Sequence, residues 1–177
     1  MRPGNPFGDL PPIPDARPLL VDEAYFEYCG DSAVGLIDDG VIVVRTFSKA
    51  FGLASARVGY ALADLETAAE LNERQDPAPV STLSAALALA GVEAGPPDVS
   101  ATIAERERLA AALRGLGLGP LPSFTNFVLV PEERAQELYE ALLDRGFAVR
   151  PSPGALRITV HRPEANDRLL EALASLS

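Results

Sequence analysis

The stretch "RTFSKAFGLASARVGY", residues 45–60, decides the fold and contains Lys49, the only lysine of the chain. Lys and Arg together number 15, so the other 14 basic residues are all arginine. Arginine therefore supplies positive charge everywhere else in the sequence. This usage weakens the interpretation of Lys49 as an ordinary surface lysine, although that alternative stays open for a lysine considered alone.

The neighbours of Lys49 indicate a site for an aldehyde that carries a phosphate. A lysine amine forms a Schiff base with an aldehyde, which arginine does not do because it stays protonated. Thr46 and Ser48 place hydroxyls beside Lys49, and Arg57 follows eight residues later. Hydroxyl and guanidinium groups hold phosphate through charge-assisted hydrogen bonds.

A second candidate segment is "VDEAY", residues 21–25, which ends an apolar run. Asp22 stands at the end of this predicted strand, where a carboxylate can stabilise a protonated ring nitrogen of a heteroaromatic cofactor. Tyr25 is placed to donate to a ring hydroxyl. A strand-end acid with a core tyrosine is the alternative, and it is favoured when the segment is considered alone.

Two further segments carry weaker signals. Arg157 lies within the apolar strand pattern "ALRITV", residues 155–160, and needs an anionic partner if it is buried. A substrate carboxylate is one candidate partner, and an ordinary salt bridge is the alternative. The sequence "GNPFG", residues 4–8, predicts a turn-rich loop.

Composition excludes several classes of function. The formal net charge of −10 argues against nucleic acid or an anionic membrane as the main partner. Cys29 is the only cysteine, so no internal disulfide can form, which fits a reducing cytoplasm. No apolar run approaches the roughly 20 residues that span a bilayer. No metal site is expected, because His161 is the only histidine.

Hydrophobic periodicity predicts an α/β organisation in the first part of the chain. Ser81 or Thr82 is expected to cap the second helix, after a break at residues 76–81. The predicted strands lie within residues 18–28, 41–44 and 57–64, and the predicted helices span 65–75 and 81–94.

From about residue 100 the pattern predicts an α+β module with the order helix, strand, helix, strand, strand, helix. The third of these elements is expected to be a helix that begins at Pro131 and ends at Gly146. The six predicted elements span residues 101–118, 123–130, 131–146, 147–151, 155–160 and 162–176.

Taken together, the motifs resemble the fold-type I pyridoxal-phosphate aminotransferases, especially the histidinol-phosphate aminotransferase branch. They occur in order over nearly the whole chain: "NP-x-G", "VDEAY", "TFSKAFGLASARVGY", "SFTNFVLV" and "ALRITV-x-R-PEAND". The resemblance implies the C-terminal part of the pyridoxal-phosphate-dependent transferase fold. Residues 1–75 would form a partial large domain with a sheet of about three strands. Residues 76–99 would connect it to a small α+β domain at 100–177.

The resemblance implies a role for each candidate residue at the cofactor. Lys49 would form the Schiff base with pyridoxal 5'-phosphate and later move the substrate proton. Asp22 would pair with the pyridine nitrogen, and Tyr25 and Asn5 would bind the ring 3-oxygen. The cofactor phosphate would be bound by Thr46, Ser48 and Arg57.

The resemblance also implies substrate-binding residues and a reaction. Arg157 would bind the substrate α-carboxylate, Arg150 would lie near a substrate phosphate, and Asn126 would contribute from the small domain. The expected reaction is transamination of an amino-acid phosphate, L-histidinol phosphate with 2-oxoglutarate, in histidine biosynthesis. A threonine-phosphate decarboxylase or another aminotransferase is one alternative, and a non-catalytic fragment is another. A cytoplasmic homodimer is expected, with no nucleic acid or membrane partner.

The sequence departs from the family pattern in ways that bear on the cofactor site. A full-length member is about twice as long, and the N-terminal arm, the Gly-rich phosphate turn and the ring-stacking aromatic residue have no counterpart here. Phe7 stands where the family loop has threonine. We therefore expect a truncated reading frame or a chain that needs an N-terminal half as its partner. An open sheet edge is expected along the strand that contains Asp22.

Overall fold

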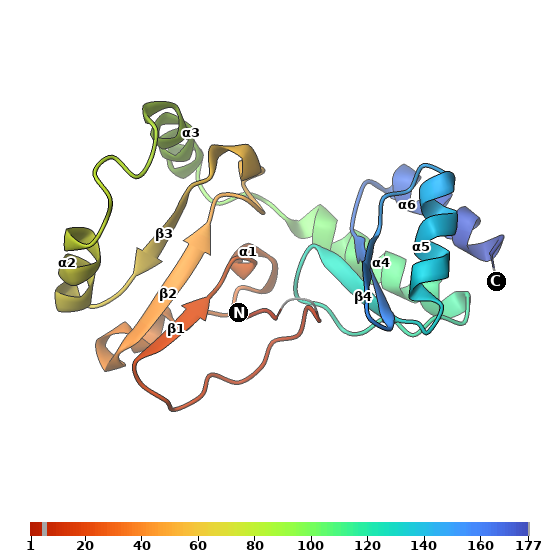
Figure 1. The fold of residues 1–177 in the computed structure, drawn as a ribbon, viewed down its shortest axis with the longest axis horizontal. Helices are drawn as coiled ribbons and strands as arrows, with labels where there is room; N and C mark the ends of the chain where they lie inside the picture. Colours follow the sequence, from red (N-terminus) through yellow and green to blue (C-terminus); the bar gives the residue numbers. More distant parts are fainter. Residues whose placement is uncertain (5–6, 177) are drawn as a thin grey trace. The chain divides into compact units, whose positions relative to one another are not determined.

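A computed structural model describes residues 1–4 and 7–176. The chain divides into two compact units, each with its own core (Figure 1). The first unit comprises residues 1–3 and 11–98, and the second comprises residues 4–10 and 99–177. The assignment of residues 1–75, 76–99 and 100–177 to family domains stays a prediction.

The first unit contains a three-stranded sheet in the order β1-β2-β3. Its strands are β1 (Leu19–Asp22), β2 (Val41–Thr46) and β3 (Gly59–Leu62). Strand β1 is parallel to β2, whereas β3 is antiparallel to β2. The carboxyl ends of β1 and β2 therefore lie at the same edge of the sheet, with Asp22 opposite Val44.

Strand β1 has β2 as its only neighbour within the part of the chain that the structure describes. Leu20 in the middle of β1 is 61% exposed. One backbone bond reaches this edge, because the Arg2 amide donates to the Asp22 carbonyl over 2.6 Å. The expected open edge along this strand is thus present.

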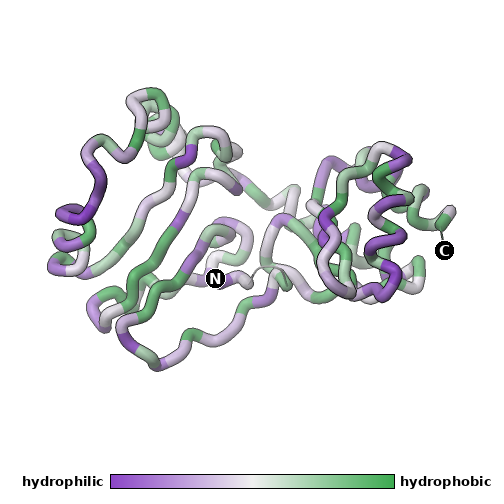
Figure 2. The backbone as a smooth tube through the Cα atoms, in the orientation of Figure 1, coloured by the Kyte–Doolittle hydropathy of each residue, from purple (hydrophilic) through white to green (hydrophobic). Residues whose placement is uncertain are grey.

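One face of this sheet is packed against a small apolar core. Val21, Val41 and Val43 alternate with more exposed neighbours and pack around Ala33. The alternation places every second side chain on the buried face, as expected for a two-residue period. Figure 2 shows the hydrophobic stretches along β1 and β2. Two short helices follow β1, α1 (Phe26–Cys29) and the 3-10 helix η1 (Val34–Asp39), and the sequence pattern did not predict them.

Two helices follow β3 in the first unit. Helix α2 (Leu65–Glu73) begins after Asp64, whose carboxylate accepts from the amides of Glu66 and Thr67. Helix α3 (Thr82–Glu93) begins after Ser81, whose hydroxyl accepts from the Ser84 amide, so the Ser81 cap is confirmed.

Helix α3 is apolar on all sides and only partly covered. Ala88 is its buried residue, facing the loop that follows β2. In contrast, Leu83 is 72% exposed, Leu89 59% and Val92 61%. Exposed apolar side chains on one helix indicate an interaction surface in many soluble proteins.

The second unit has an antiparallel sheet in the order β4-β6-β5, and the predicted order of its elements is confirmed. Its core is formed by the sheet and three helices around Leu109, Leu113, Val128, Leu142 and Ile158. The strands are β4 (Phe127–Pro131), β5 (Arg150–Ser152) and β6 (Ala155–Thr159). The helices are α4 (Ser100–Gly115), α5 (Ala135–Asp144) and α6 (Pro163–Ala174).

The predicted helix start at Pro131 is wrong. Pro131 is the last residue of β4 and lies opposite Ala155 of β6, and α5 begins only at Ala135. A proline fits the end of a strand because no ladder hydrogen bond from its nitrogen is needed there. Strand β5 also begins later than predicted, at Arg150, and the preceding Phe147 and Val149 pack against the core outside the strand.

Candidate functional site

Lys49 lies in the loop that connects β2 to β3. Its position is determined by backbone hydrogen bonds across the loop base, where the Phe47 amide donates to the Val58 carbonyl over 3.1 Å. The Leu53 amide donates to the Phe47 carbonyl over 2.9 Å, and the Gly52 amide donates to the Lys49 carbonyl over 3.0 Å. The loop is therefore a closed turn that presents Lys49 beyond the end of β2.

Aromatic packing supports this loop from one side. Phe47 is buried, and its ring centroid lies 4.8 Å from that of Phe51. Helix α3 approaches closely at Gly91, where a Cβ atom would lie 3.3 Å from the Phe51 ring. Phe47 and Phe51 flank Lys49 in the sequence, so their packing on α3 restrains the segment that carries the amine.

The loop and the strand ends form a pocket of about 570 Å³ in the first unit. It brings together five of the predicted site residues: Lys49, Asp22, Thr46, Ser48 and Arg57. The remaining wall is formed by Leu20, Ala24, Val44, Arg45, Val58 and Gly59. One amine, one carboxylate, two hydroxyls and a guanidinium thus share one cavity.

The Lys49 amine is half-buried and lies beside an aromatic ring. Its Nζ atom is 5.2 Å from the centroid of the buried Tyr25 ring. Among the described residues, this amine forms no hydrogen bond or ion pair. A cation at this distance from a ring face is attracted to it, and this attraction orients the amine towards Tyr25.

Asp22 is half-buried at the end of β1. Its Oδ1 atom accepts a hydrogen bond from the Ala24 amide over 3.0 Å, which fixes the carboxylate in a local turn. Among the described residues, Oδ2 accepts no hydrogen bond. One carboxylate oxygen is therefore positioned by the chain, and Asp22 lines the same cavity as Lys49.

Hydroxyl groups are ordered at the end of β2. The Thr46 hydroxyl donates to the Val58 carbonyl over 3.3 Å and accepts from the Ser48 amide over 3.1 Å. These bonds fold the chain back on itself directly after the strand, so that both hydroxyl-bearing residues line the pocket.

Arg57 has an unusual backbone conformation for a residue with a side chain. Its φ angle is 52°, in the left-handed region, which costs about 1 kcal/mol for residues other than glycine. Its side chain is exposed and donates to the Ala54 carbonyl over 2.9 Å. Strained backbone of this kind gathers at functional sites, and Arg57 is one of the residues that line the pocket.

The other predicted site residues lie elsewhere. Asn5 is outside the described residues. Arg150, Arg157 and Asn126 belong to the second unit. Asn126 directly precedes β4, and its carbonyl accepts from the Val160 amide over 2.8 Å.

Arg150 and Arg157 face each other across the β5–β6 pair. The Arg157 guanidinium carbon lies 4.5 Å from the centroid of the Phe127 ring. Like charges directly opposite in a sheet are destabilising, by up to about 1 kcal/mol. Both arginine side chains leave the same face of this strand pair.

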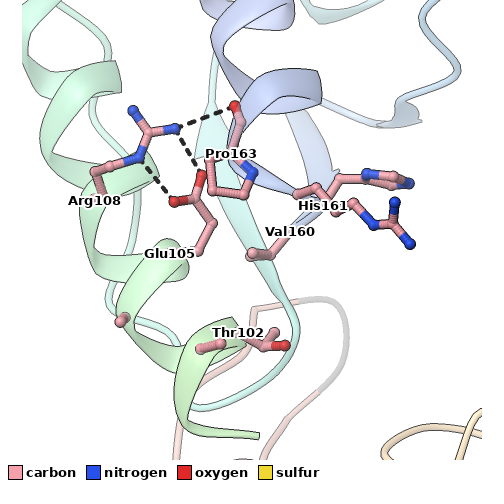
Figure 3. Close-up of a pocket in the computed structure, with 9 residues that line it drawn as sticks. Thr102, Glu105, Arg108, Val160, His161 and Pro163 are labelled. Atoms are coloured by element: carbon pink, nitrogen blue, oxygen red, sulfur yellow. Dashed lines mark hydrogen bonds and ion pairs between the residues drawn. The ribbon is translucent and has the colours of Figure 1, made fainter.

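A second pocket, of about 620 Å³, lies in the second unit between α4 and the start of α6 (Figure 3). Arg108 forms two hydrogen bonds with the Glu105 carboxylate, at 2.8 and 2.7 Å. The amide of Asn166 also donates to Glu105, over 2.7 Å. The hydrogen bond from Arg108 is the main reason why the pKa of Glu105 lies below its usual value. These groups satisfy one another and connect two helices.

Sequence reasoning assigned no role to Glu23 and Arg45, although both lie in the quoted motifs. The structure places them beside Asp22 and Thr46 as a buried ion pair, with 3.1 Å between Arg45 Nη2 and Glu23 Oε2. The available signal was a charged residue two positions after a buried valine: Glu23, directly beyond β1, follows Val21, and Arg45 in β2 follows Val43.

The described residues contain no group of three or more His, Cys, Asp or Glu side chains that could hold a metal ion. Over the same residues, every helix is too short or too polar to cross a bilayer.

An α/β fold with a lysine in the loop after a central strand, beside a carboxylate, hydroxyls and a guanidinium, is typical of enzymes that bind an aldehyde cofactor. The family model for aminotransferase class I and II matches residues 3–173, and the chain belongs to this family.

The similar curated proteins are histidinol-phosphate aminotransferases. The protein from Thermoanaerobacter pseudethanolicus is 40% identical over 99% of this chain, and the protein from Staphylococcus haemolyticus is 41% identical over 97%. These matches cover 55% and 54% of the two relatives. The chain therefore spans about half the length of the curated relatives that it matches.

Solved structures show the same relation. Histidinol-phosphate aminotransferase from Sinorhizobium meliloti, in complex with pyridoxal-5'-phosphate, superposes with a TM-score of 0.79 at 30% identity. L-threonine-O-3-phosphate decarboxylase from Porphyromonas gingivalis shares the fold, with a TM-score of 0.85 at 22% identity. Each match covers 99% of this chain but only 56% and 62% of those chains. The fold is thus α/β and corresponds to part of the aminotransferase fold.

Proposed function

We propose that the pocket around Lys49 binds pyridoxal 5'-phosphate. The observation that carries this proposal is the shared cavity of Lys49, Asp22, Thr46, Ser48 and Arg57. These side chains fit the cofactor group by group: an amine for the aldehyde, a carboxylate for the ring nitrogen, and hydroxyls with a guanidinium for the phosphate.

Each residue has a separate task in this proposal. When bound, pyridoxal phosphate supplies an electron sink for the pair released at the substrate Cα. The Asp22 Oδ2 atom keeps the ring nitrogen protonated, and its partner oxygen is already held by the Ala24 amide. Lys49 Nζ accepts the Cα proton and later returns it, acting as general acid and base beside the Tyr25 ring. Tyr25 and Asn5 are proposed to bind the ring 3-oxygen.

The proposed reaction is transamination of an amino-acid phosphate, with L-histidinol phosphate as donor and 2-oxoglutarate as acceptor. The names of the similar curated proteins support this choice. The pairing of Arg150 with Arg157 adds support, because it puts two guanidinium groups on one face of the strand pair, where a substrate carboxylate or phosphate would meet opposite charge. Arg157 is proposed for the α-carboxylate, Arg150 for the phosphate, and Asn126 as a neighbouring contact.

A threonine-phosphate decarboxylase or another aminotransferase is the second candidate. A decarboxylase of L-threonine-O-3-phosphate shares this fold. Both reactions use the same cofactor residues, so substrate kinetics separate them. A decarboxylase releases CO₂ without an acceptor, whereas an aminotransferase needs a 2-oxo acid.

The working form is proposed to be a cytoplasmic homodimer. The exposed apolar residues of α3 support an interface with a second copy. The site is further proposed to use residues from the remaining length of the relatives, of which this chain spans about half. A chain that folds without catalysis is the corresponding alternative for these 177 residues alone.

An absorbance titration with pyridoxal phosphate tests the proposal. The wild-type chain is expected to develop the visible band of lysine-bound cofactor, and borohydride reduction should fix one cofactor on Lys49, seen by peptide mass spectrometry. Lys49→Ala should show neither result. A wild-type chain without the band would overturn the proposal for this chain alone. Steady-state assays with histidinol phosphate and with threonine phosphate then identify the substrate.

A further inference from the structure

Glu23 and Arg45 form a buried ion pair next to the pocket, whose wall includes Arg45. The Glu23 side chain is fully buried, with 0% exposure, and that of Arg45 is 13% exposed. Arg45 donates from Nε and from Nη2 to Glu23 Oε2, both over 3.1 Å. Its guanidinium carbon also lies 3.5 Å from the centroid of the Phe26 ring.

The same carboxylate is held by the segment that follows α1. Glu23 Oε1 accepts from the Ala33 amide over 2.6 Å, and Oε2 accepts from the Ser32 hydroxyl over 2.8 Å. Arg45 Nη2 donates to that hydroxyl as well, over 2.8 Å. The network is therefore closed, which is the arrangement that makes a buried charge tolerable.

The pair connects the residues that neighbour the proposed cofactor ligands. Glu23 directly follows Asp22 at the end of β1, and Arg45 directly precedes Thr46 at the end of β2. The Glu23 amide donates to the Val44 carbonyl over 2.8 Å, so the two strand ends are joined through backbone and side chains together.

We propose that Glu23 and Arg45 are positioning residues, which fix the separation of Asp22 from the Thr46–Lys49 segment and thereby tune cofactor binding. This inference rests on the proposed function of the pocket. Neither side chain is a proposed ligand of the cofactor. Their effect passes through Asp22 and Thr46, which lie at the joined strand ends. Asp22 accepts a hydrogen bond from the Ala24 amide, and Thr46 accepts one from the Ser48 amide.

A purely structural ion pair is the competing explanation, and a charge-free replacement separates the two. Single variants, Glu23→Gln and Arg45→Met, leave one buried partner unpaired and lower stability. The double variant Glu23→Gln/Arg45→Met removes both charges but keeps an amide oxygen that can accept from the Ala33 amide, so stability can recover. A structural role predicts that the double variant recovers stability and cofactor affinity together.

The test measures the thermal unfolding midpoint, the dissociation constant for pyridoxal phosphate and the pH midpoint of its visible band. The double variant is expected to regain the unfolding midpoint, to bind cofactor at least ~10-fold more weakly and to shift the pH midpoint, since small displacements of positioned groups cost this much or more. Glu105→Gln is the matched control, because it weakens a buried pair of the second unit and should leave the cofactor constants unchanged. Recovery of affinity with stability would overturn the inference.

Amide hydrogen exchange gives a readout that does not need the cofactor. The amides of Ala24 and Ser48, which donate to Asp22 and Thr46, should exchange faster in the double variant and unchanged in Glu105→Gln. Unchanged exchange at both amides would overturn the positioning role. A wild-type chain without the visible band, but with the expected exchange, would instead count against cofactor binding by this chain.

Discussion

At the scale of single residues, Lys49 and Arg57 are two cationic side chains whose positions have different requirements. Lys49 is the only amine side chain in the sequence, and its Nζ atom lies 5.2 Å from the Tyr25 ring centroid. Arginine is common in this sequence, but Arg57 is unusual because its backbone is left-handed, with φ at 52°. The proposed function needs a nucleophile at Lys49, whereas Arg57 retains a guanidinium despite backbone strain.

Lys49→Arg separates the nucleophile from its charge. The guanidinium keeps a cation in the pocket but forms no Schiff base, because it stays protonated. The visible cofactor band and the borohydride-fixed adduct should both disappear, whereas the unfolding midpoint should change by less than about 0.5 kcal/mol in equivalent free energy. A remaining adduct in this variant would show that another amine reacts.

Arg57→Gly and Arg57→Ala distinguish backbone strain from side-chain binding. Both variants remove the guanidinium and should weaken cofactor binding by about 1.5–3 kcal/mol, the usual value of a hydrogen bond to a charged group. Glycine accepts a φ of 52° without strain, so Arg57→Gly should be more stable than Arg57→Ala by about 1 kcal/mol. Urea unfolding and cofactor titration measure the two effects, and equal stabilities would contradict the strain argument.

At the scale of elements, the β2–β3 pair depends on a glycine. A Cβ atom at Gly59 would lie 2.6 Å from the Arg45 carbonyl oxygen, which belongs to the backbone of β2 and cannot move away freely. Gly59 lies opposite Thr46, and both residues line the pocket.

Gly59→Ala should therefore lower stability by about 1–3 kcal/mol, the range for overpacking a close contact. Cofactor binding should weaken as well, because the displaced strand carries Thr46. Gly30→Ala is a suitable comparison, since no atom lies within 4 Å of a Cβ there and only the positive φ of 69° opposes it. A Gly59→Ala chain with wild-type cofactor affinity would contradict this account.

The hydrogen bonds of Glu105 that link α4 and α6 should make part of the second unit's folding stability sensitive to acid. The pKa of Glu105 is lowered in the folded state, mainly by its hydrogen bond from Arg108. This contribution to stability is complete above the unfolded-state pKa and is lost as the pH falls through the lower folded-state pKa. Glu105→Gln should cost about 1–3 kcal/mol near neutral pH and reduce the loss of stability in acid. Urea unfolding between neutral and acidic pH checks both effects, and an unchanged acid limb would contradict the assignment.

Elements with a strong repeat or cap were predictable from the sequence, and elements set by tertiary contacts were not. Ser81 before an apolar run predicted the start of α3, and the β-branched residues 41–44 predicted β2. Pro131 was misassigned because its pairing with Ala155 of β6 outweighs the usual preference of proline for a helix start. Helix α1 has only four residues, too few for a periodic signal.

The candidate site was predictable where a short sequence motif contains the reactive side chains. Lys49, Asp22, Thr46, Ser48 and Arg57 were named from their residue types and spacing, and they share a pocket. Glu23 and Arg45 were not, because nothing in a sequence shows that two charges 22 residues apart point into one buried space. The roles of Asn5, Asn126, Arg150 and Arg157 stay predictions.

At the scale of the whole molecule, the chain consists of two units with separate cores and carries an apolar helix that is largely uncovered. We expect this helix to lie in the homodimer interface. Sedimentation should give a species of twice the 18.7 kDa monomer mass. Leu89→Glu with Val92→Glu should shift the equilibrium to monomer, because charge is costly to bury in an apolar contact. Leu65→Glu, at the start of α2 and 90% exposed, is the control. An unchanged dimer would place the interface elsewhere.

The loop around Lys49 also has a consequence for proteolysis. A protease that cleaves only after lysine has a single target in this chain, the Lys49–Ala50 bond, and would release residues 1–49 and 50–177. That bond lies between Phe47 and Phe51, whose rings pack 4.8 Å apart and hold the loop closed. Cleavage therefore requires local opening of this one loop. The rate at which the two fragments appear on a gel then reports how readily the loop opens.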